Sequence, residues 1–155
     1  MPALYDHMCL TVGDIDRSVE FYERYFGLKP VRRDPLHGGE MVECMTGVEG
    51  GSLFAVFMTN GHFVLELIQF VDGSGGGDKA AGANTVGCPH IGFSVLDVRE
   101  VYTAWSAEGV RFQGPPVLSK RHLKWSAMMF DPDGIMIELR EGPALTAEQM
   151  TLAQN

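Results

Sequence analysis

The sequence predicts an α+β fold made of two tandem βαβββ modules, because one order of patterns occurs twice. His7 opens an apolar run that leads into a helical pattern, and His90 opens a second run with the same order of residue types. Gly27 and Gly109, which end the two predicted helices, follow those histidines after 20 and 19 residues. Agreement across so many features indicates a duplicated unit.

The first module begins with a strand over residues 4–12, where polar and apolar side chains alternate. Asp14 and Asp16 are both candidates for the N-cap of the helix that follows, and Gly27 is the expected stop. Further strands are predicted over residues 28–33, 41–46, 52–59 and 62–70, with a loop over 34–39 and a hairpin turn at Asn60-Gly61.

The second module repeats this order with one predicted strand fewer. A strand is predicted over residues 89–95, and Val98, Val101 and Trp105 form the apolar face of a helix. Strands are then predicted over residues 110–112, 125–130 and 135–140, with a polar, basic stretch over 119–124 and a tight turn over 131–134. The chain therefore divides into a first module (1–71), a glycine-rich linker (72–86), a second module (87–141) and a tail (142–155).

Charge and composition exclude several classes of function. The net charge of −8 disfavours a nucleic acid or an anionic membrane as partner. No run of 18 apolar residues exists, so no membrane span is expected, and the N-terminus lacks the pattern of a signal peptide. Three cysteines at unrelated spacings favour free thiols in a reducing cytoplasm.

Each module closes with a glutamate inside an apolar strand pattern. Glu66 lies in Val64-Leu65-Glu66-Leu67, and Glu138 lies in Met136-Ile137-Glu138-Leu139. A buried carboxylate is costly unless a cation compensates it, so either a cation is bound there or that face of the strand meets water. Two histidines and two glutamates are the donors that a site formed by both modules would offer to one divalent ion, and Zn, Ni, Co, Mn or Fe(II) would suit them.

The same residues carry a family resemblance over about residues 4–141. The strand with His7, the helix start at residues 14–22, the Phe26-Gly27-Leu28 stop and the Asp131-Pro132-Asp133-Gly134 turn before Glu138 resemble the vicinal oxygen chelate superfamily. This superfamily includes glyoxalase I, methylmalonyl-CoA epimerase, extradiol dioxygenases and the fosfomycin and bleomycin resistance proteins. The resemblance implies curved mixed sheets around a metal-centred cavity. The implied metal ligands are His7, Glu66, His90 and Glu138.

Glutamate at position 66 looks like glyoxalase I, whereas the epimerases usually have glutamine there and the dioxygenases use two histidines and one glutamate. The resemblance implies a metal-dependent isomerase or lyase that chelates a small molecule through two adjacent oxygens and shifts a proton through a metal-stabilised enediolate. Glu138 is the expected base and Glu66 the alternative. The two positions that hold glutathione in bacterial-type glyoxalase I are Thr11 and Phe70 here, so a glutathione adduct is not the expected substrate.

Substrate contacts are the least specific part of the prediction. The candidates are Thr11, Phe70, His122, Lys124 and Trp125. The pattern favours core or pocket wall for Trp125 and Phe70, and a solvated loop for Lys124, over a specific substrate contact. Glu43 and Arg140 either line the cavity or have a structural role.

Three other functions remain open at this point. The first two are an acyl-CoA epimerase, similar to methylmalonyl-CoA epimerase, and an Fe(II) extradiol ring-cleaving dioxygenase. The third is a small-molecule binding protein of the bleomycin-resistance kind, although such proteins generally lack the ligand set. Because members of the superfamily are commonly dimers, a homodimer is expected, with the site formed in one chain or across two.

Overall fold

The computed structural model describes residues 2–72, 82–121 and 123–143. The chain forms two compact units, Met1–Lys79 and Ala80–Asn155, which are described separately below. Most of the predicted glycine-rich linker, at 73–81, and the tail from 144 onward lie outside the described residues. In the part of the chain that is described, no helix is long and apolar enough to cross a membrane.

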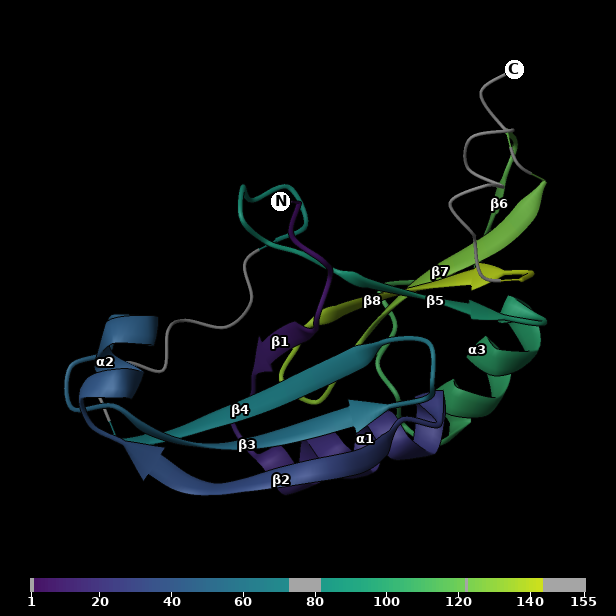
Figure 1. Cartoon of the computed structure of the whole chain (residues 1–155). Helices are drawn as coiled ribbons and strands as arrows, with labels where there is room; N and C mark the ends of the chain where they lie inside the picture. Colours follow the sequence, from purple (N-terminus) through teal and green to yellow (C-terminus); the bar gives the residue numbers. More distant parts are fainter. Residues whose placement is uncertain (1, 73–81, 122, 144–155) are drawn as a thin grey trace. The chain divides into compact units, whose positions relative to one another are not determined.

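The first unit contains a four-stranded mixed sheet and two helices (Figure 1). Its elements in chain order are β1 (Met8–Thr11), α1 (Ile15–Phe26), β2 (Lys29–Gly38), α2 (Glu40–Thr46), β3 (Ser52–Thr59) and β4 (Val64–Asp72). The strand order is β1-β4-β3-β2, in which β1 runs parallel to β4 and the other neighbours are antiparallel.

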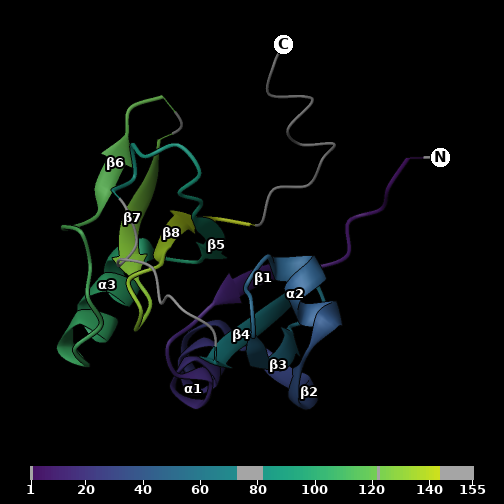
Figure 2. The same cartoon turned by 90° about the vertical axis from the view of Figure 1, so that its left-hand side faces the viewer.

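The second unit repeats this arrangement with one helix (Figure 2). Its elements are β5 (Ile91–Val95), α3 (Val98–Ala107), β6 (Val117–Ser119), β7 (Lys124–Phe130) and β8 (Met136–Glu141). The strand order is β5-β8-β7-β6, and again the first strand is parallel to the last. The α+β fold with a strand, a helix and three strands in each half is therefore confirmed.

Both long helices begin at an aspartate, and of the two candidates for the first helix the N-cap is Asp14. Asp14 caps α1 by accepting a hydrogen bond from the backbone N–H of Arg17, and Gly27 ends the helix in the left-handed conformation, with φ of 63°. Asp97 caps α3 in the same way, with hydrogen bonds from the backbone N–H groups of Arg99 and Glu100. An aspartate oxygen supplies a partner for N–H groups that the first helical turn leaves free, so these caps define the helix starts.

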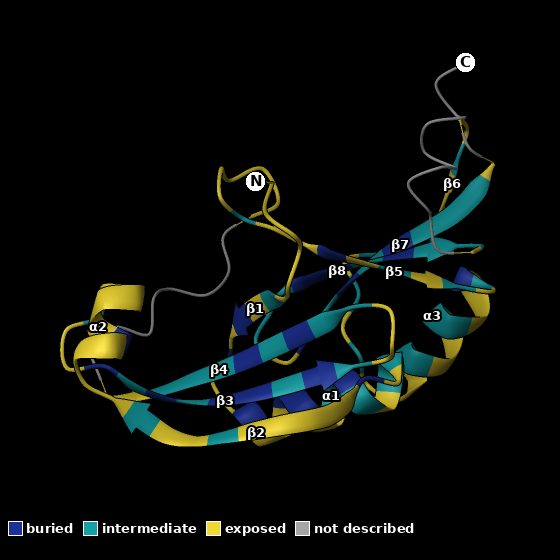
Figure 3. Ribbon diagram, in the orientation of Figure 1, coloured by how far each residue is buried: buried dark blue, intermediate teal, exposed yellow. Residues whose placement is uncertain are grey.

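Each sheet has one face packed on its long helix and an opposite face, called here the open face. Leu65 and Leu67 of β4, and Ile137 and Leu139 of β8, are fully buried on the helix side. Buried bands alternate with partly exposed ones along β4 in Figure 3. Because side chains alternate along a strand, the residues between them lie on the open face. This alternation fixes Glu66 and Glu138 on the open faces.

One predicted strand is wrong. Residues 41–46 form the helix α2 instead. A short apolar run can be either element, and periodicity alone does not separate them. Here only Val42 of the run is buried, and it packs with Leu53 and Ala55 on the open face of the first sheet.

Strand ends account for the other differences. The loop predicted over residues 34–39 is mostly strand, because β2 continues to Gly38 through an irregular register that accommodates Pro35 at the sheet edge. The strand predicted over residues 110–112 is reduced to a single bridge between Phe112 and Met129. The short edge strand β6, which the sequence analysis did not predict, pairs with β7 in that region.

Candidate metal centre

The two predicted histidines occupy equivalent places, one residue before the first strand of each unit. His7 precedes β1, and His90 precedes β5. The two glutamates are equivalent as well, since Glu66 of β4 lies beside Cys9, and Glu138 of β8 lies beside Gly92, in the same parallel register. The duplication therefore extends from the order of elements to the positions of the candidate ligands.

In each unit the histidine and the glutamate meet. Nε2 of His7 lies 3.0 Å from Oε2 of Glu66, and Nε2 of His90 lies 3.5 Å from Oε2 of Glu138. These side chains remain partly open to solvent, with exposed fractions of 33% for His7 and 18% for Glu66. Within the described ranges no group of three or more His, Cys, Asp or Glu side chains could hold a metal ion, so each unit alone offers two donors.

The spacing of the donors fits a divalent ion. Bonds from such an ion to imidazole nitrogen and carboxylate oxygen are about 2.1 Å long, which puts two neighbouring ligands of an octahedron roughly 3 Å apart. The distance between Nε2 of His7 and Oε2 of Glu66 is 3.0 Å. The pair can therefore accept an ion with little rearrangement, and the pair of His90 with Glu138 needs a movement of a few tenths of an ångström.

Asp6 orients the first histidine. Its Oδ2 lies 2.7 Å from Nδ1 of His7. This hydrogen bond, assisted by the charge of Glu66 and opposed by burial, raises the pKa of His7 above its ordinary value. A carboxylate on one ring nitrogen leaves the other nitrogen as the metal-binding atom. The sequence analysis did not predict this role for Asp6, although Asp6 directly precedes His7 in the sequence. The second unit has no equivalent carboxylate, because Pro89 precedes His90.

Phe57 and Arg32 form the wall beside this pair. The Phe57 ring packs edge-on against the His7 ring, with 5.8 Å between their centroids. The Arg32 guanidinium lies 4.5 Å from the centroid of Phe57 and forms an ion pair with Asp34. The sequence analysis did not predict a position near His7 for Arg32, because the location of Arg32 on the open face depends on the pairing of β2 with β3.

Cys9 lies beside Glu66 on the open face of the first sheet. Burial, and then the negative charge of Glu66, raise the pKa of Cys9 to about 12. At pH 8 only about one thiol in ten thousand would be the reactive thiolate, a fraction that follows from a pKa of about 12.

Cys9 and Cys44 are both exposed, so we expect Cys9 to react with iodoacetamide at pH 8 much more slowly than Cys44 because the pKa of Cys9 is raised. Glu66→Gln should speed the reaction of Cys9, because removing the charge lowers its pKa and increases the thiolate fraction. Mass spectrometry of peptides from a time course gives both rates. Labelling of Cys9 as fast as Cys44 would contradict the raised pKa of this thiol.

The predicted substrate contacts fall in different environments. Thr11 is exposed on the open face of the first sheet, whereas Phe70 packs against the cluster formed by Val42, Leu53 and Ala55. Trp125 lies on the helix side of β7, with the guanidinium of Arg99 5.2 Å from its ring centroid. Lys124 lies one position earlier and so points to the open face, while His122 lies outside the described residues.

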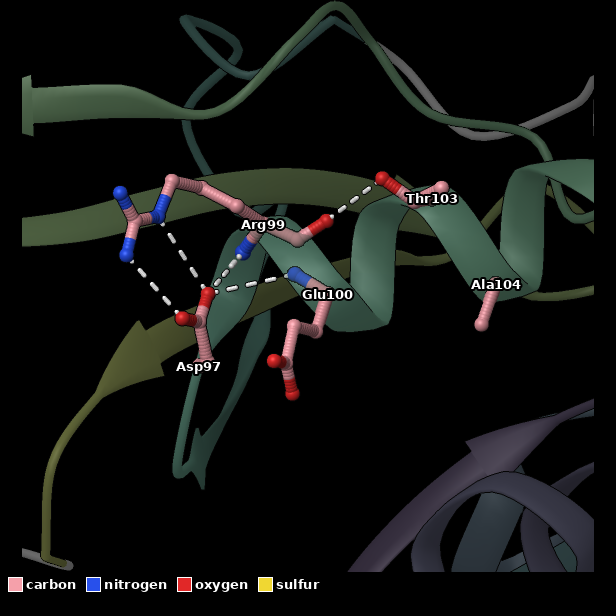
Figure 4. Close-up of a pocket in the computed structure, with 5 residues that line it drawn as sticks. All are labelled: Asp97, Arg99, Glu100, Thr103 and Ala104. Atoms are coloured by element: carbon pink, nitrogen blue, oxygen red, sulfur yellow. Dashed lines mark hydrogen bonds and ion pairs between the residues drawn. The ribbon is translucent and has the colours of Figure 1, made fainter.

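A surface depression on α3 is separate from these pairs (Figure 4). It is lined by Asp97, Arg99, Glu100, Thr103 and Ala104. Asp97 there accepts the hydrogen bonds that cap the helix and pairs with Arg99. Because neither His90 nor Glu138 lines it, the depression reflects the helix cap and its ion pair.

Comparison with known proteins identifies the family. The model of the Glyoxalase/Bleomycin resistance protein/Dioxygenase superfamily matches residues 4–139. The chain belongs to this superfamily. A curated relative, "Probable lactoylglutathione lyase, chloroplastic" from Arabidopsis thaliana, is 30% identical over 139 residues, which cover 88% of this chain and 35% of that protein. The chain thus spans about a third of the length of this relative.

Solved structures show the same fold. A glyoxalase family protein from Bacillus cereus has a TM-score of 0.76 and 24% identity, covering 88% of this chain and 92% of its own. A glyoxalase I variant from Zea mays has a TM-score of 0.62 and 22% identity, covering 89% of this chain and 45% of its own. The fosfomycin resistance protein FosX from Listeria monocytogenes, solved with Mn(II) and 1S,2S-dihydroxypropylphosphonic acid, has a TM-score of 0.63 and 18% identity over the full length of both chains.

Proposed function

We propose that the protein is a divalent-metal-dependent enzyme of the glyoxalase type, an isomerase or lyase acting on a small molecule with two adjacent oxygens. The observation that carries the proposal is the repeated pair of donors. Nε2 of a histidine and Oε2 of a glutamate come within 3.0 Å in one unit and 3.5 Å in the other, at equivalent strand positions. Neither pair has an obvious need to be duplicated for stability alone.

The proposed site joins the two pairs on one ion, within one chain or between the two chains of a homodimer. Two neutral imidazoles and two carboxylates balance the charge of a divalent ion and leave two octahedral positions for substrate oxygens. Zn, Ni, Co, Mn and Fe(II) all suit such a mixed set of nitrogen and oxygen donors. Asp6 would keep Nε2 of His7 directed at the ion.

A bound divalent ion would hold the two substrate oxygens and withdraw electrons from the carbonyl, which makes the neighbouring C–H group acidic. Glu138 is the proposed base that takes this proton and returns it to the adjacent carbon, with Glu66 as the alternative. Both side chains are partly exposed, at 32% for Glu138 and 18% for Glu66, so a substrate can reach them.

The name of the Arabidopsis relative supports the reaction type. It does not extend to the substrate, because residues 11 and 70 lack the arginine and asparagine expected for glutathione. Phe70 is in addition packed in the cluster around Val42. A substrate without glutathione is therefore proposed.

The proposal is tested by metal content and proton exchange. After purification and dialysis, elemental analysis should find one divalent ion for each set of four ligands. The metal-loaded protein should then incorporate deuterium from D2O at the α-carbon of dihydroxyacetone, measured by NMR. Molecular mass from sedimentation shows whether the set forms in one chain or in a dimer.

A matched pair of double variants makes this test specific. Replacing His7 and His90 by alanine should abolish both metal retention and exchange, whereas replacing His37 and His62, which lie outside the two pairs, should leave both intact. Exchange that persists without metal would contradict the proposal. Oxygen consumption with catechol would instead support a dioxygenase, and turnover of the glutathione hemithioacetal of methylglyoxal would overturn the proposed substrate class.

A further inference from the structure

The open face of the second sheet carries a polar row next to the Glu138 row. Arg140 of β8 has Ser94 of β5 on one side and Ser126 of β7 on the other, all in direct register. One step closer to His90, the equivalent row consists of Gly92, Glu138 and Met128. Residues two apart on a strand are roughly 7 Å apart, so the Arg140 row lies within reach of a small molecule held at Glu138.

The first sheet has apolar residues at two of the three equivalent positions. The row next to Glu66 consists of Thr11, Ile68 and Ala55. Ile68 and Ala55 belong to the cluster around Val42, so α2 packs on this part of the open face. The second unit has no described helix between its strands β6, β7 and β8, so its polar row is not covered in that way. The two halves of the duplication have therefore diverged at this row.

Arg140 is a half-buried cation without a charge partner among the described residues. Its neighbour Glu141 instead accepts a hydrogen bond at Oε2 from the backbone N–H of Trp125, at 3.2 Å. Glu138 shares its face, but the only ion pair recorded for that carboxylate among the described residues is the one to His90. Lys124, one row further along the same face, is also half-buried and forms no ion pair with a described acid. Partly desolvated cations without counter-charges are costly unless an anion binds them.

We propose that Arg140, assisted by Lys124, Ser94 and Ser126, binds an anionic group of the substrate. The guanidinium can donate two parallel hydrogen bonds to a carboxylate or phosphate, and the serine hydroxyls can donate further ones. The substrate is then a hydroxy or oxo compound that chelates through two adjacent oxygens and carries a second, anionic group a few bonds away. The identity of this substrate rests on the proposed function, whereas the anion site itself does not.

Three α-hydroxy acids with the same chelating end test the inference in the zinc-loaded protein. Lactate has no second anion, malate has a carboxylate, and 3-phosphoglycerate has a phosphate. We expect malate, 3-phosphoglycerate or both to bind roughly 10- to 100-fold more tightly than lactate in calorimetric titrations, the gain in affinity typical of a hydrogen-bonded charge pair. Whichever probe gains more identifies the preferred anion.

Variants then test whether Arg140 causes the higher affinity for the probes with a second anionic group. Arg140→Gln should remove the preference over lactate without changing lactate affinity, and Arg140→Lys should keep part of it. Arg33→Gln is the control with the same charge change, because Arg33 pairs with Asp16 on the helix side of the first sheet. An equal affinity for all three probes, or a preference that survives Arg140→Gln, would overturn the inference.

A metal-free titration separates this outcome from failure of the metal site. Inorganic phosphate added to the metal-free protein should shift the Nε–H signal of Arg140 in an NMR spectrum. In the Arg140→Lys protein, phosphate binding, followed by the signals of residues next to position 140, should be weaker. If the protein takes up no metal but phosphate shifts Arg140, the proposed function fails and the anion site stands. If phosphate leaves the Arg140 signal unchanged, the anion site fails whatever the metal content.

Discussion

Glu138→Gln is expected to lower the rate of α-proton exchange by about 10²- to 10⁴-fold, the usual contribution of a general base. The amide of glutamine cannot accept the proton at neutral pH, although it keeps the size of the side chain and one oxygen donor. Glu138 is the better candidate because it is more exposed than Glu66, at 32% against 18%, and because the polar row of Arg140 adjoins it. The measurement is deuterium incorporation into dihydroxyacetone under saturating substrate.

Metal content must be measured in the same samples, because loss of the ion would imitate loss of the base. Glu66→Gln tests the alternative base, and Glu100→Gln on α3 makes the same charge change within the second unit without touching the pair. A Glu138→Gln protein that retains its metal and full turnover would remove Glu138 from the role of base. A larger loss in Glu66→Gln would transfer the role to Glu66.

Much of the fold was predictable because the signals are local. The N-cap aspartates determine where α1 and α3 begin, and Gly27 ends α1, whereas the C-cap of α3 is Glu108, one residue before the predicted Gly109. Each of these residues acts through its own neighbouring backbone. The alternation around Glu66 and Glu138 likewise follows from strand geometry alone. The repeat singled out His7, Glu66, His90 and Glu138 as a set, and the family resemblance implied that they bind one ion; that each histidine lies against the glutamate of its own unit is seen only in the structure.

The rest depended on partners that lie far along the chain. The helix α2 forms where a strand was expected, because Val42 finds its partners Leu53 and Ala55 on β3. The face on which Trp125 lies follows from the register of β7 with β8, in which Met128 rather than Trp125 opposes Glu138. The role of Arg140 was open for the same reason, since its serine neighbours come from two other strands.

Leu67→Ala is expected to lower the free energy of unfolding by about 2–5 kcal/mol, as for other fully buried leucines. Leu67 has no exposed surface, and it packs between Leu10 of β1 and Val56 of β3 on the helix side of the first sheet. Urea titration followed by circular dichroism measures the change. Val71→Ala is the control on the same strand, because Val71 is 42% exposed and its substitution should lower the free energy of unfolding only slightly.

This stability measurement also bears on the candidate metal centre. Leu67 and Glu66 are adjacent, so burial of the leucine against the helix is what directs the glutamate to the open face. A shift of one residue in the strand register would exchange the two. If Leu67→Ala unfolds at the same urea concentration as the unmodified protein, Leu67 is not buried against the helix and β4 faces the other way. Glu66 would then lie under α1, where Nε2 of His7 could not reach it.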